Sequence, residues 1–325
     1  MTTILVTGGA GFVGSHVCLA LARQGFTPVT FDNLSRGHRK LVKWGPLEIG
    51  DIRDTGRLIE VLSTHQPQAV IHCAALAYVG ESMEDPAPYH DINVRGSLSL
   101  LEAMRAHGLS RIVLSSTCAV YGVPKDLPIT ERTPCQPINT YGATKLVVEG
   151  ILADYTRAYG FRTLALRYFN AGGADPDGLT GEIHDPEPHV IPRVLMTAEG
   201  SLPHFGLLGD DWPTQDGTCI RDYVHVSDLA DTHVAAIGYL DRETRYPFLN
   251  LGTNSGFSVR QIVDVARRVT GHPIPVKVDP RRPGDPPALV ARADVAATEL
   301  GFTPHRSSME TIVETAWAWR RQTQG

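Results

Sequence analysis

The sequence is poor in cysteine and has no long apolar run. Only five cysteines occur in 325 residues; they are scattered (Cys18, Cys73, Cys118, Cys135 and Cys219) and form no Cys-x-x-Cys pair or Cys/His cluster. This pattern argues against a disulfide framework and against a metal site, and it favours reduced thiols in a cytoplasmic protein. No apolar stretch approaches the about 20 residues of a membrane helix, and the run at residues 4–6 is too short for a signal peptide.

No run of lysine or arginine marks a surface for nucleic acid or for a membrane. The formal net charge is -5, and a mildly acidic protein is repelled by phosphate backbones. We therefore expect neither nucleic acid nor a membrane among the partners. The sequence also has no internal repeat, and its 42% hydrophobic and 20% charged residues are typical of an ordinary globular protein.

The first half of the chain alternates short apolar runs with amphipathic stretches. The apolar runs predict strands and the amphipathic stretches predict helices. Strands are predicted at residues 3–7, 28–31, 69–72, 111–114 and 163–166, and helices at residues 13–23, 58–62, 98–106 and 141–159. This alternation predicts an α/β fold with a doubly wound parallel Rossmann sheet, in which ligands bind at the carboxyl ends of the strands.

The pattern changes after residue 167. Residues 171–216 are rich in Gly, Pro, Asp and His, with one short helical stretch near residues 194–198, which is typical of loops around a site. Regular signals return as helices at residues 226–239, 259–270 and 309–320 and as strands at residues 248–251 and 275–278. We predict a sheet domain over residues 1–167 and a smaller substrate-binding lobe over residues 168–325. Elements around residues 226–251 are expected to return to the first domain.

A glycine-rich turn follows the first predicted strand. Residues 7–14 read Thr-Gly-Gly-Ala-Gly-Phe-Val-Gly, and Gly8, Gly11 and Gly14 open the first helix. Such a turn lets a diphosphate approach the free N–H groups of the helix N-terminus. Asp32, at the end of the next strand, would accept hydrogen bonds from a ribose diol and would repel a 2′-phosphate, so NAD is favoured. Arg36 lies nearby and keeps NADP open as an alternative.

Three residues predict acid–base chemistry. Thr117 follows the strand at residues 111–114, and Tyr141 and Lys145 share one face at the start of a helix. A tyrosine with its ordinary pKa near ~10 is a poor base at neutral pH. We expect Lys145 and a bound nicotinamide cation to lower the pKa of Tyr141, and Thr117 to bridge Tyr141 and a substrate oxygen.

Together these residues resemble the extended short-chain dehydrogenase/reductase family over nearly the whole chain. The resemblance continues in Asp51-Ile52, in the segment from His72 to Ala75, in Asn93 and in Val120-Tyr121-Gly122. It implies a tightly held NAD cofactor. The contacts that it implies, beyond the glycines, Asp32, Tyr141 and Lys145, are Phe12, Val13, Asn33, Asp51, Ile52, Cys73, Ala74, Ala75, Ala77, Asn93 and Phe169.

Within that family the chain resembles the UDP-galactose 4-epimerases. The motifs are Val-Gly-Glu-Ser at residues 79–82, Arg-Tyr-Phe-Asn at 167–170, Pro-Thr-x-Asp-Gly-Thr at 213–218, Arg-Asp-Tyr-Val-His-Val at 221–226 and Arg-Arg-x-Gly-Asp at 281–285. The resemblance implies interconversion of UDP-glucose and UDP-galactose by transient oxidation at C4, in a homodimer paired through the helices at residues 98–106 and 141–159. The implied UDP-sugar contacts are Thr117, Asn170, His189, Val190, Gly206, Arg221, Tyr223, Arg282, Asp285 and Leu289.

Some positions depart from the family pattern, and some alternatives stay open. Ala77 stands where many of these epimerases have a lysine, and Leu208 stands where an aromatic residue near the uracil is common. A 4,6-dehydratase needs an acid/base pair after Thr117, and Cys118-Ala119 cannot serve as one. A net oxidoreductase, a non-catalytic NAD-binding protein and an epimerase of another UDP-sugar remain as alternatives. The preferred sugar is open, because Leu289 replaces a tyrosine found in strict enzymes.

Overall fold

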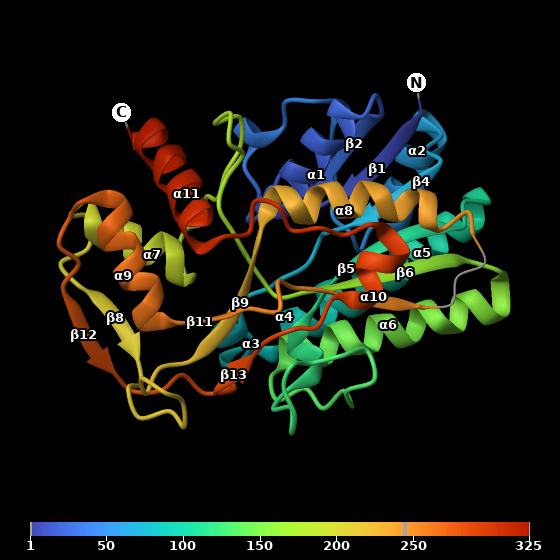
Figure 1. The fold of residues 1–325 in the computed structure, drawn as a ribbon. Coiled ribbons are helices and arrows are strands. Elements are labelled where there is room, and N and C mark those ends of the chain that lie inside the picture. Colours follow the sequence, from blue (N-terminus) through green and yellow to red (C-terminus); the bar gives the residue numbers. More distant parts are fainter. Residues whose placement is uncertain (1, 243–245, 325) are drawn as a thin grey trace.

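Seven parallel strands form the central sheet, in the order β10-β6-β5-β4-β1-β2-β3 (Figure 1). The computed structural model describes residues 2–242 and 246–324; residues 243–245, inside the stretch expected to return to the sheet, lie outside the described residues. The strands are β1 (Thr3–Thr7), β2 (Thr27–Asp32), β3 (Leu47–Ile49), β4 (Ala69–His72), β5 (Arg111–Thr117), β6 (Arg162–Tyr168) and β10 (Phe248–Leu251). The predicted doubly wound parallel fold is confirmed.

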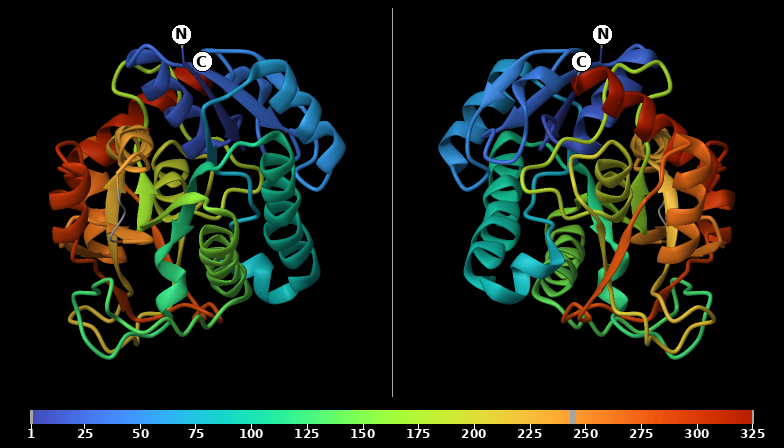
Figure 2. Two further views of the ribbon diagram at one scale, coloured as in Figure 1. Left: turned by 90° about the vertical axis from the view of Figure 1, so that its right-hand side faces the viewer. Right: turned by 90° about the vertical axis from the view of Figure 1, so that its left-hand side faces the viewer.

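Helices cover both faces of this sheet because its strands are apolar on both sides. In β1, Ile4 and Val6 join a core with α1 (Phe12–Arg23) and α8 (Val226–Tyr239), whereas Leu5 joins the core on the opposite face. That opposite face is covered by three helices, which Figure 2 shows in its two side views. They are α2 (Thr55–His65), α5 (Gly96–His107) and α6 (Thr140–Tyr159). Buried parallel strands of this kind need such two-sided cover.

A smaller lobe packs around a third apolar core. Its sheet has the order β11-β9-β13, with β7 paired to β9, and a separate two-stranded sheet joins β8 and β12. Its strands are β7 (Asn170–Gly172), β8 (Phe205–Leu208), β9 (Ile220–His225), β11 (Gly256–Ser258), β12 (Val276–Asp279) and β13 (Ala288–Leu289). Its helices are α7 (Val190–Ala198), α9 (Val259–Thr270) and α11 (Met309–Gln324). In Figure 1 these elements lie to the left of the large sheet.

Short helical segments complete the described chain. They are α3 (Val79–Glu84), α4 (Pro86–Tyr89), α10 (Asp294–Leu300), a π-type turn at His90–Arg95 and 3-10 turns at Arg39–Leu41 and Cys118–Tyr121. Within residues 2–242 and 246–324, no helix is both long and apolar enough to span a bilayer.

The chain returns from the smaller lobe to the large sheet in the stretch where the sequence pattern led us to expect it. β10 returns to the large sheet and pairs with β6, and α8 shares a core with α1. The loop prediction for residues 171–216 was wrong at β8, and β9 was missed altogether. In β9 the charged Arg221 and Asp222 interrupt the apolar pattern. Asp222 is fully buried, and the backbone N–H groups of Thr253 and Ala291 donate hydrogen bonds that compensate its carboxylate.

A buried ion pair joins three elements beneath the strand ends. Arg167 in β6 is 2% exposed, and its Nη2 lies 2.5 Å from Oε2 of Glu149 in α6. The Glu149 carboxylate also accepts a hydrogen bond of 2.5 Å from Oγ of Ser116 in β5. The guanidinium lies 3.5 Å from the centroid of the Phe248 ring. Each charge is thus neutralised without water.

Glu149→Gln should destabilise the protein by about 3 kcal/mol or more, because it leaves the Arg167 charge buried and unpaired. Urea unfolding at neutral pH measures the change. Asp154→Asn on the same helix is the matched control: Asp154 pairs with Arg157, and both side chains are more than half exposed. That control should cost under about 1 kcal/mol, and equal losses in the two variants would contradict the assigned role of the buried pair.

Candidate functional site

One cavity of about 870 Å³ lies at the carboxyl ends of the large sheet and extends into the smaller lobe. Nearly all the predicted site residues line this cavity. They are Gly8, Gly11, Phe12, Val13, Gly14, Asp32, Asn33, Asp51, Ile52, Cys73, Ala74, Ala75, Ala77, Thr117, Tyr141, Phe169, Asn170, His189, Val190, Gly206, Arg221, Tyr223, Arg282, Asp285 and Leu289. Lys145 and Asn93 do not line it.

The glycine turn presents an open helix N-terminus to the cavity. Gly8 has φ +71°, and a Cβ on Gly14 would lie 2.1 Å from the Gly8 carbonyl oxygen, so both positions require glycine. Gly11 precedes α1, and no side chain caps that helix. A Cβ on Gly11 would meet only the Gly8 oxygen, at 3.4 Å, so this side of the turn faces free space. The turn therefore fits a dinucleotide diphosphate.

Asp32 and Arg36 bear on the choice between NAD and NADP. The Asp32 carboxylate accepts hydrogen bonds from the backbone N–H of Ala10, at 3.0 Å, and of Leu34, at 2.8 Å. Burial raises its pKa above the ordinary value. Arg36 donates to both carboxylate oxygens of Glu81 at 2.9 Å, which neutralises the charge that a 2′-phosphate would need. This leaves Asp32 as the uncompensated charge here, and a carboxylate at this position suits a ribose diol better than a 2′-phosphate.

Polar side chains that bond one another line the cavity near β3. Asp51 is bound by Arg53 at 2.7 Å, and Nδ2 of Asn33 donates to it at 3.4 Å. These hydrogen bonds, with Arg53 as the largest cause, lower the pKa of Asp51 to about 2, so it is ionised at neutral pH. Asn93, away from the cavity, bonds Leu76 N and O and holds the segment between β4 and α3.

Tyr141 and Thr117 meet at the centre of the cavity. Thr117 ends β5, and Tyr141 stands in the first turn of α6, which begins after Asn139 caps Gly142 N at 2.8 Å. Burial raises the pKa of Tyr141 above its ordinary value, and a side-chain hydrogen bond with Thr117 acts in the opposite direction. The phenol and the hydroxyl are therefore placed to share one substrate oxygen.

Lys145 is buried one turn beyond Tyr141 on α6. Its Nζ donates to the Ser115 carbonyl oxygen at 2.8 Å, and burial lowers its pKa to about 8. The lowering of the Tyr141 pKa by Lys145 and a bound nicotinamide cation stays a prediction.

The opposite end of the cavity carries positive charge. Arg282 donates two hydrogen bonds of 2.9 Å to the Asp285 carboxylate, and Arg221 in β9 lies 3.8 Å from the same carboxylate. Two guanidinium groups on one carboxylate leave a net positive charge, which suits a second diphosphate. Leu289 in β13 lies beside Arg221 in the sheet and packs in a cluster that includes Cys118 and Phe169.

Some cavity residues were missed by the sequence reasoning. Tyr78, Glu182 and His184 line the cavity, and no family motif drew attention to them. The signal that could have found the last two is the spacing Glu-x-His-x-x-Glu-x-His at residues 182–189, which lies in the segment interpreted as plain loop.

Residues 4–252 match the model of the NAD dependent epimerase/dehydratase family. The chain belongs to this family. A UDP-glucose 4-epimerase from Rhizobium leguminosarum bv. trifolii is 49% identical over 98% of this chain and 97% of that protein. The crystal structure of UDP-glucose 4-epimerase from Brucella ovis in complex with NAD has a TM-score of 0.94 and 52% identity over 98% of each chain. That from Bifidobacterium longum, in complex with NAD+ and UDP, has a TM-score of 0.95 and 38% identity over 99% of each chain.

For this epimerase/dehydratase family member, Tyr141→Phe should lower turnover by at least about 100-fold, the range of general acid–base catalysis. The ring stays in place and only the proton acceptor is lost, so nucleotide binding should survive. A coupled assay with UDP-sugar measures turnover, and calorimetry with UDP measures binding. Tyr159→Phe, on the exposed end of the same helix, is the control. Near-normal turnover of Tyr141→Phe would remove Tyr141 from the mechanism.

Proposed function

We propose that the chain interconverts UDP-glucose and UDP-galactose with a bound NAD cofactor, and that its cavity holds both nucleotides at once. The observation that carries the proposal is the placement of the Tyr141–Thr117 pair between two ends that each suit a diphosphate. The glycine turn of α1 stands at one end and Arg221 with Arg282 at the other. The NAD- and UDP-bound relatives support this division.

The same placement supports the proposed site roles. The predicted cofactor contacts around α1 and β2 hold the dinucleotide, and the predicted substrate contacts hold the UDP-sugar. Residues 1–167, together with α8 and β10, are proposed as the cofactor part, and the rest of residues 168–325 as the UDP-sugar part. Lys145, which bonds the Ser115 carbonyl oxygen, is proposed to contact the nicotinamide ribose.

The proposed mechanism is a redox-neutral cycle. Tyr141 accepts the proton of the sugar 4-hydroxyl, and Thr117 bridges the same oxygen. A bound NAD, held by the glycine turn and Asp32, would supply the reversible hydride chemistry at C4, while the sugar turns about its bond to the diphosphate. Tyr141 then gives the proton back to O4. Arg221 and Arg282 hold the diphosphate throughout, so that only the sugar turns.

A dehydratase reaction is disfavoured by the residues after Thr117. Cys118 is the side chain available there, and burial raises the pKa of its thiol to about 12, so it serves neither as an acid nor as a base near neutral pH. The neighbouring Ala119 has no titratable group.

The purified protein, given UDP-glucose and no added cofactor, should form UDP-galactose, and denaturation should release about one NAD per chain. Chromatography of the sugar nucleotides and an enzymatic NAD assay measure both. The alternatives predict different products: free NADH for a net oxidoreductase, a 4-keto-6-deoxy sugar for a dehydratase, and unchanged UDP-sugar for a non-catalytic protein. Released NADP would show that Arg36 outweighs Asp32.

The breadth of sugar specificity is proposed to depend on Leu289. Leucine is shorter than tyrosine and has no hydroxyl, and apolar pockets reject a modest extra group by only about 1–3 kcal/mol. We expect UDP-glucose and UDP-galactose as the main pair, with measurable turnover of UDP-N-acetylglucosamine. Leu289→Tyr should lower kcat/KM for the larger sugar more than for UDP-glucose. An unchanged ratio of the two values would show that other residues close the pocket.

A cytoplasmic homodimer is part of the proposal. Leu98 in α5 and Val147 and Tyr159 in α6 are exposed by 37%, 47% and 55%, which leaves an apolar surface on these helices for a second copy. Light scattering at micromolar concentration measures the mass. All five cysteines are free thiols, which suits a reducing compartment.

A further inference from the structure

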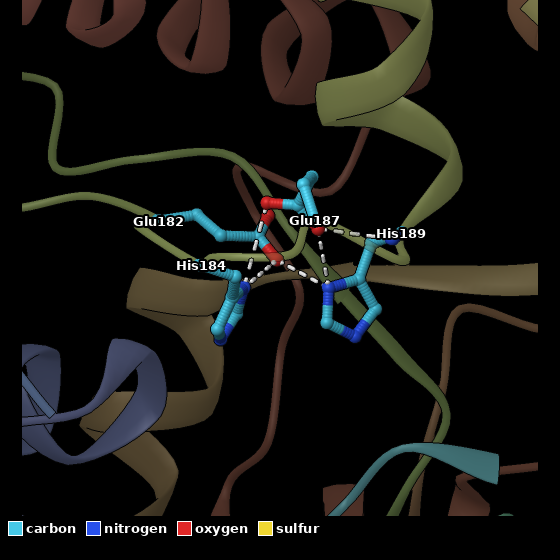
Figure 3. Close-up of side chains that lie close together, drawn as sticks. All are labelled: Glu182, His184, Glu187 and His189. Atoms are coloured by element: carbon cyan, nitrogen blue, oxygen red, sulfur yellow. Dashed lines mark hydrogen bonds and ion pairs between the residues drawn. The ribbon is translucent and has the colours of Figure 1, made fainter. Parts of the chain in front are cut away.

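Two histidines and two glutamates converge in the segment between β7 and α7. Glu182, His184, Glu187 and His189 come from eight consecutive residues, and Figure 3 shows their side chains turned toward one another. One oxygen or nitrogen from each lies within 4.8 Å of the corresponding atoms of the others. Glu182, His184 and His189 line the cavity, and His189 is also a predicted UDP-sugar contact, but none of the four belongs to the Tyr141–Thr117 pair.

The two imidazoles present the same ring atom to the two carboxylates. Nδ1 of His189 lies 2.7 Å from Oε1 of Glu182 and 2.9 Å from Oε1 of Glu187. Nδ1 of His184 lies 3.1 Å from Oε1 of Glu182 and 3.5 Å from Oε2 of Glu187. In a tetrahedral zinc site with bonds of about 2.0–2.2 Å, neighbouring donor atoms are about 3.3–3.6 Å apart. The four nitrogen–oxygen distances here are 2.7–3.5 Å and no two donors lie more than 4.8 Å apart, so rotations of the side chains can arrange them around a central ion.

Protonated histidines can neutralise the two carboxylates, but they leave some donor atoms of this cluster unmatched. Each Nδ1 carries at most one hydrogen, yet each faces two carboxylates. Among the described residues, Nδ1 of His184 is enclosed but makes no well-formed hydrogen bond. The side chains of Glu182 and Glu187 are only 10% and 8% exposed, and buried carboxylates require compensating positive charge. One divalent ion at the centre gives this charge and uses all four donors.

We propose that Glu182, His184, Glu187 and His189 form a binding site for a divalent zinc-type transition-metal ion. Two imidazole nitrogens and two carboxylate oxygens match the donors that zinc takes, whereas calcium and magnesium take oxygen donors. This proposal departs from our expectation that the chain has no metal site, and it does not depend on the proposed reaction.

The site is structural, because four side chains fill a tetrahedral coordination sphere and leave no position for substrate. The ion would clamp the loop to the start of α7, since His189 precedes that helix and Glu182 lies seven residues earlier. The His184 ring also packs edge-on against Phe12 at the start of α1, with a centroid distance of 6.5 Å. The ion would thus fix the loop between the two nucleotide ends of the cavity.

Metal binding can be measured on the full-length, tag-free protein after dialysis against EDTA and then against metal-free buffer. Titration with ZnCl2 alone, followed by equilibrium dialysis and elemental analysis, should give one zinc per chain with a Kd below about 1 μM. Glu187→Gln should raise the Kd at least about ten-fold, the range for a lost metal-site interaction. His184→Gln combined with Glu187→Gln should abolish stoichiometric binding.

His65→Gln is the matched control, because His65 also contacts a glutamate, with Nε2 at 2.7 Å from Glu48, but has no second histidine beside it. It should bind zinc like the parent. Absence of stoichiometric zinc in the parent, or equal affinity in the double variant, overturns the proposal.

A second measurement needs no variant and so does not depend on folding of the mutants. Co2+ added to the parent protein should give the strong visible absorption of a tetrahedral ion, and ZnCl2 should displace it. A spectrum of hydrated, octahedral Co2+ only would overturn the proposal.

Discussion

The buried pair of Arg167 and Glu149 is the contact on which the catalytic arrangement depends. Glu149 lies one turn beyond Lys145 on α6, and it accepts a hydrogen bond from Ser116, the residue before Thr117. The pair therefore fixes the end of β5 against the start of α6. Two buried opposite charges stabilise the fold only while both are present and hydrogen-bonded. The backbone at Ser116 and Thr117 is therefore restricted to the arrangement that keeps these bonds.

The signals of the residues proposed to do chemistry are local. The glycine turn and the Tyr141/Lys145 spacing each lie within eight residues and follow strands of plain apolar pattern. What was missed depends on tertiary contacts. The buried polar Asp222 interrupts the apolar pattern of β9, and the direction of the Lys145 ammonium depends on the Ser115 carbonyl of β5. Spacing alone contains neither fact, since each requires the partner element to be in place.

The two lobes are joined by very short connections. β6 ends at Tyr168 and β7 begins at Asn170, while β9 ends at His225 and α8 begins at the next residue. Because β7 and β9 also pair with each other, these two connections run side by side where they leave the large sheet. They leave little free chain to absorb a relative movement of the lobes at this point.

The pairing of β13 with β9 places Leu289 directly opposite Arg221 in the register. One residue is proposed to contact the sugar, and the other the diphosphate. A bulkier or smaller residue at position 289 is expected to shift β13. Because Leu289 pairs with Arg221, this shift is also expected to move the Arg221 guanidinium. Selection for a new sugar in this scaffold is therefore expected to change the affinity for the nucleotide as well. Compensating substitutions belong in β9 rather than in the wall of the sugar pocket.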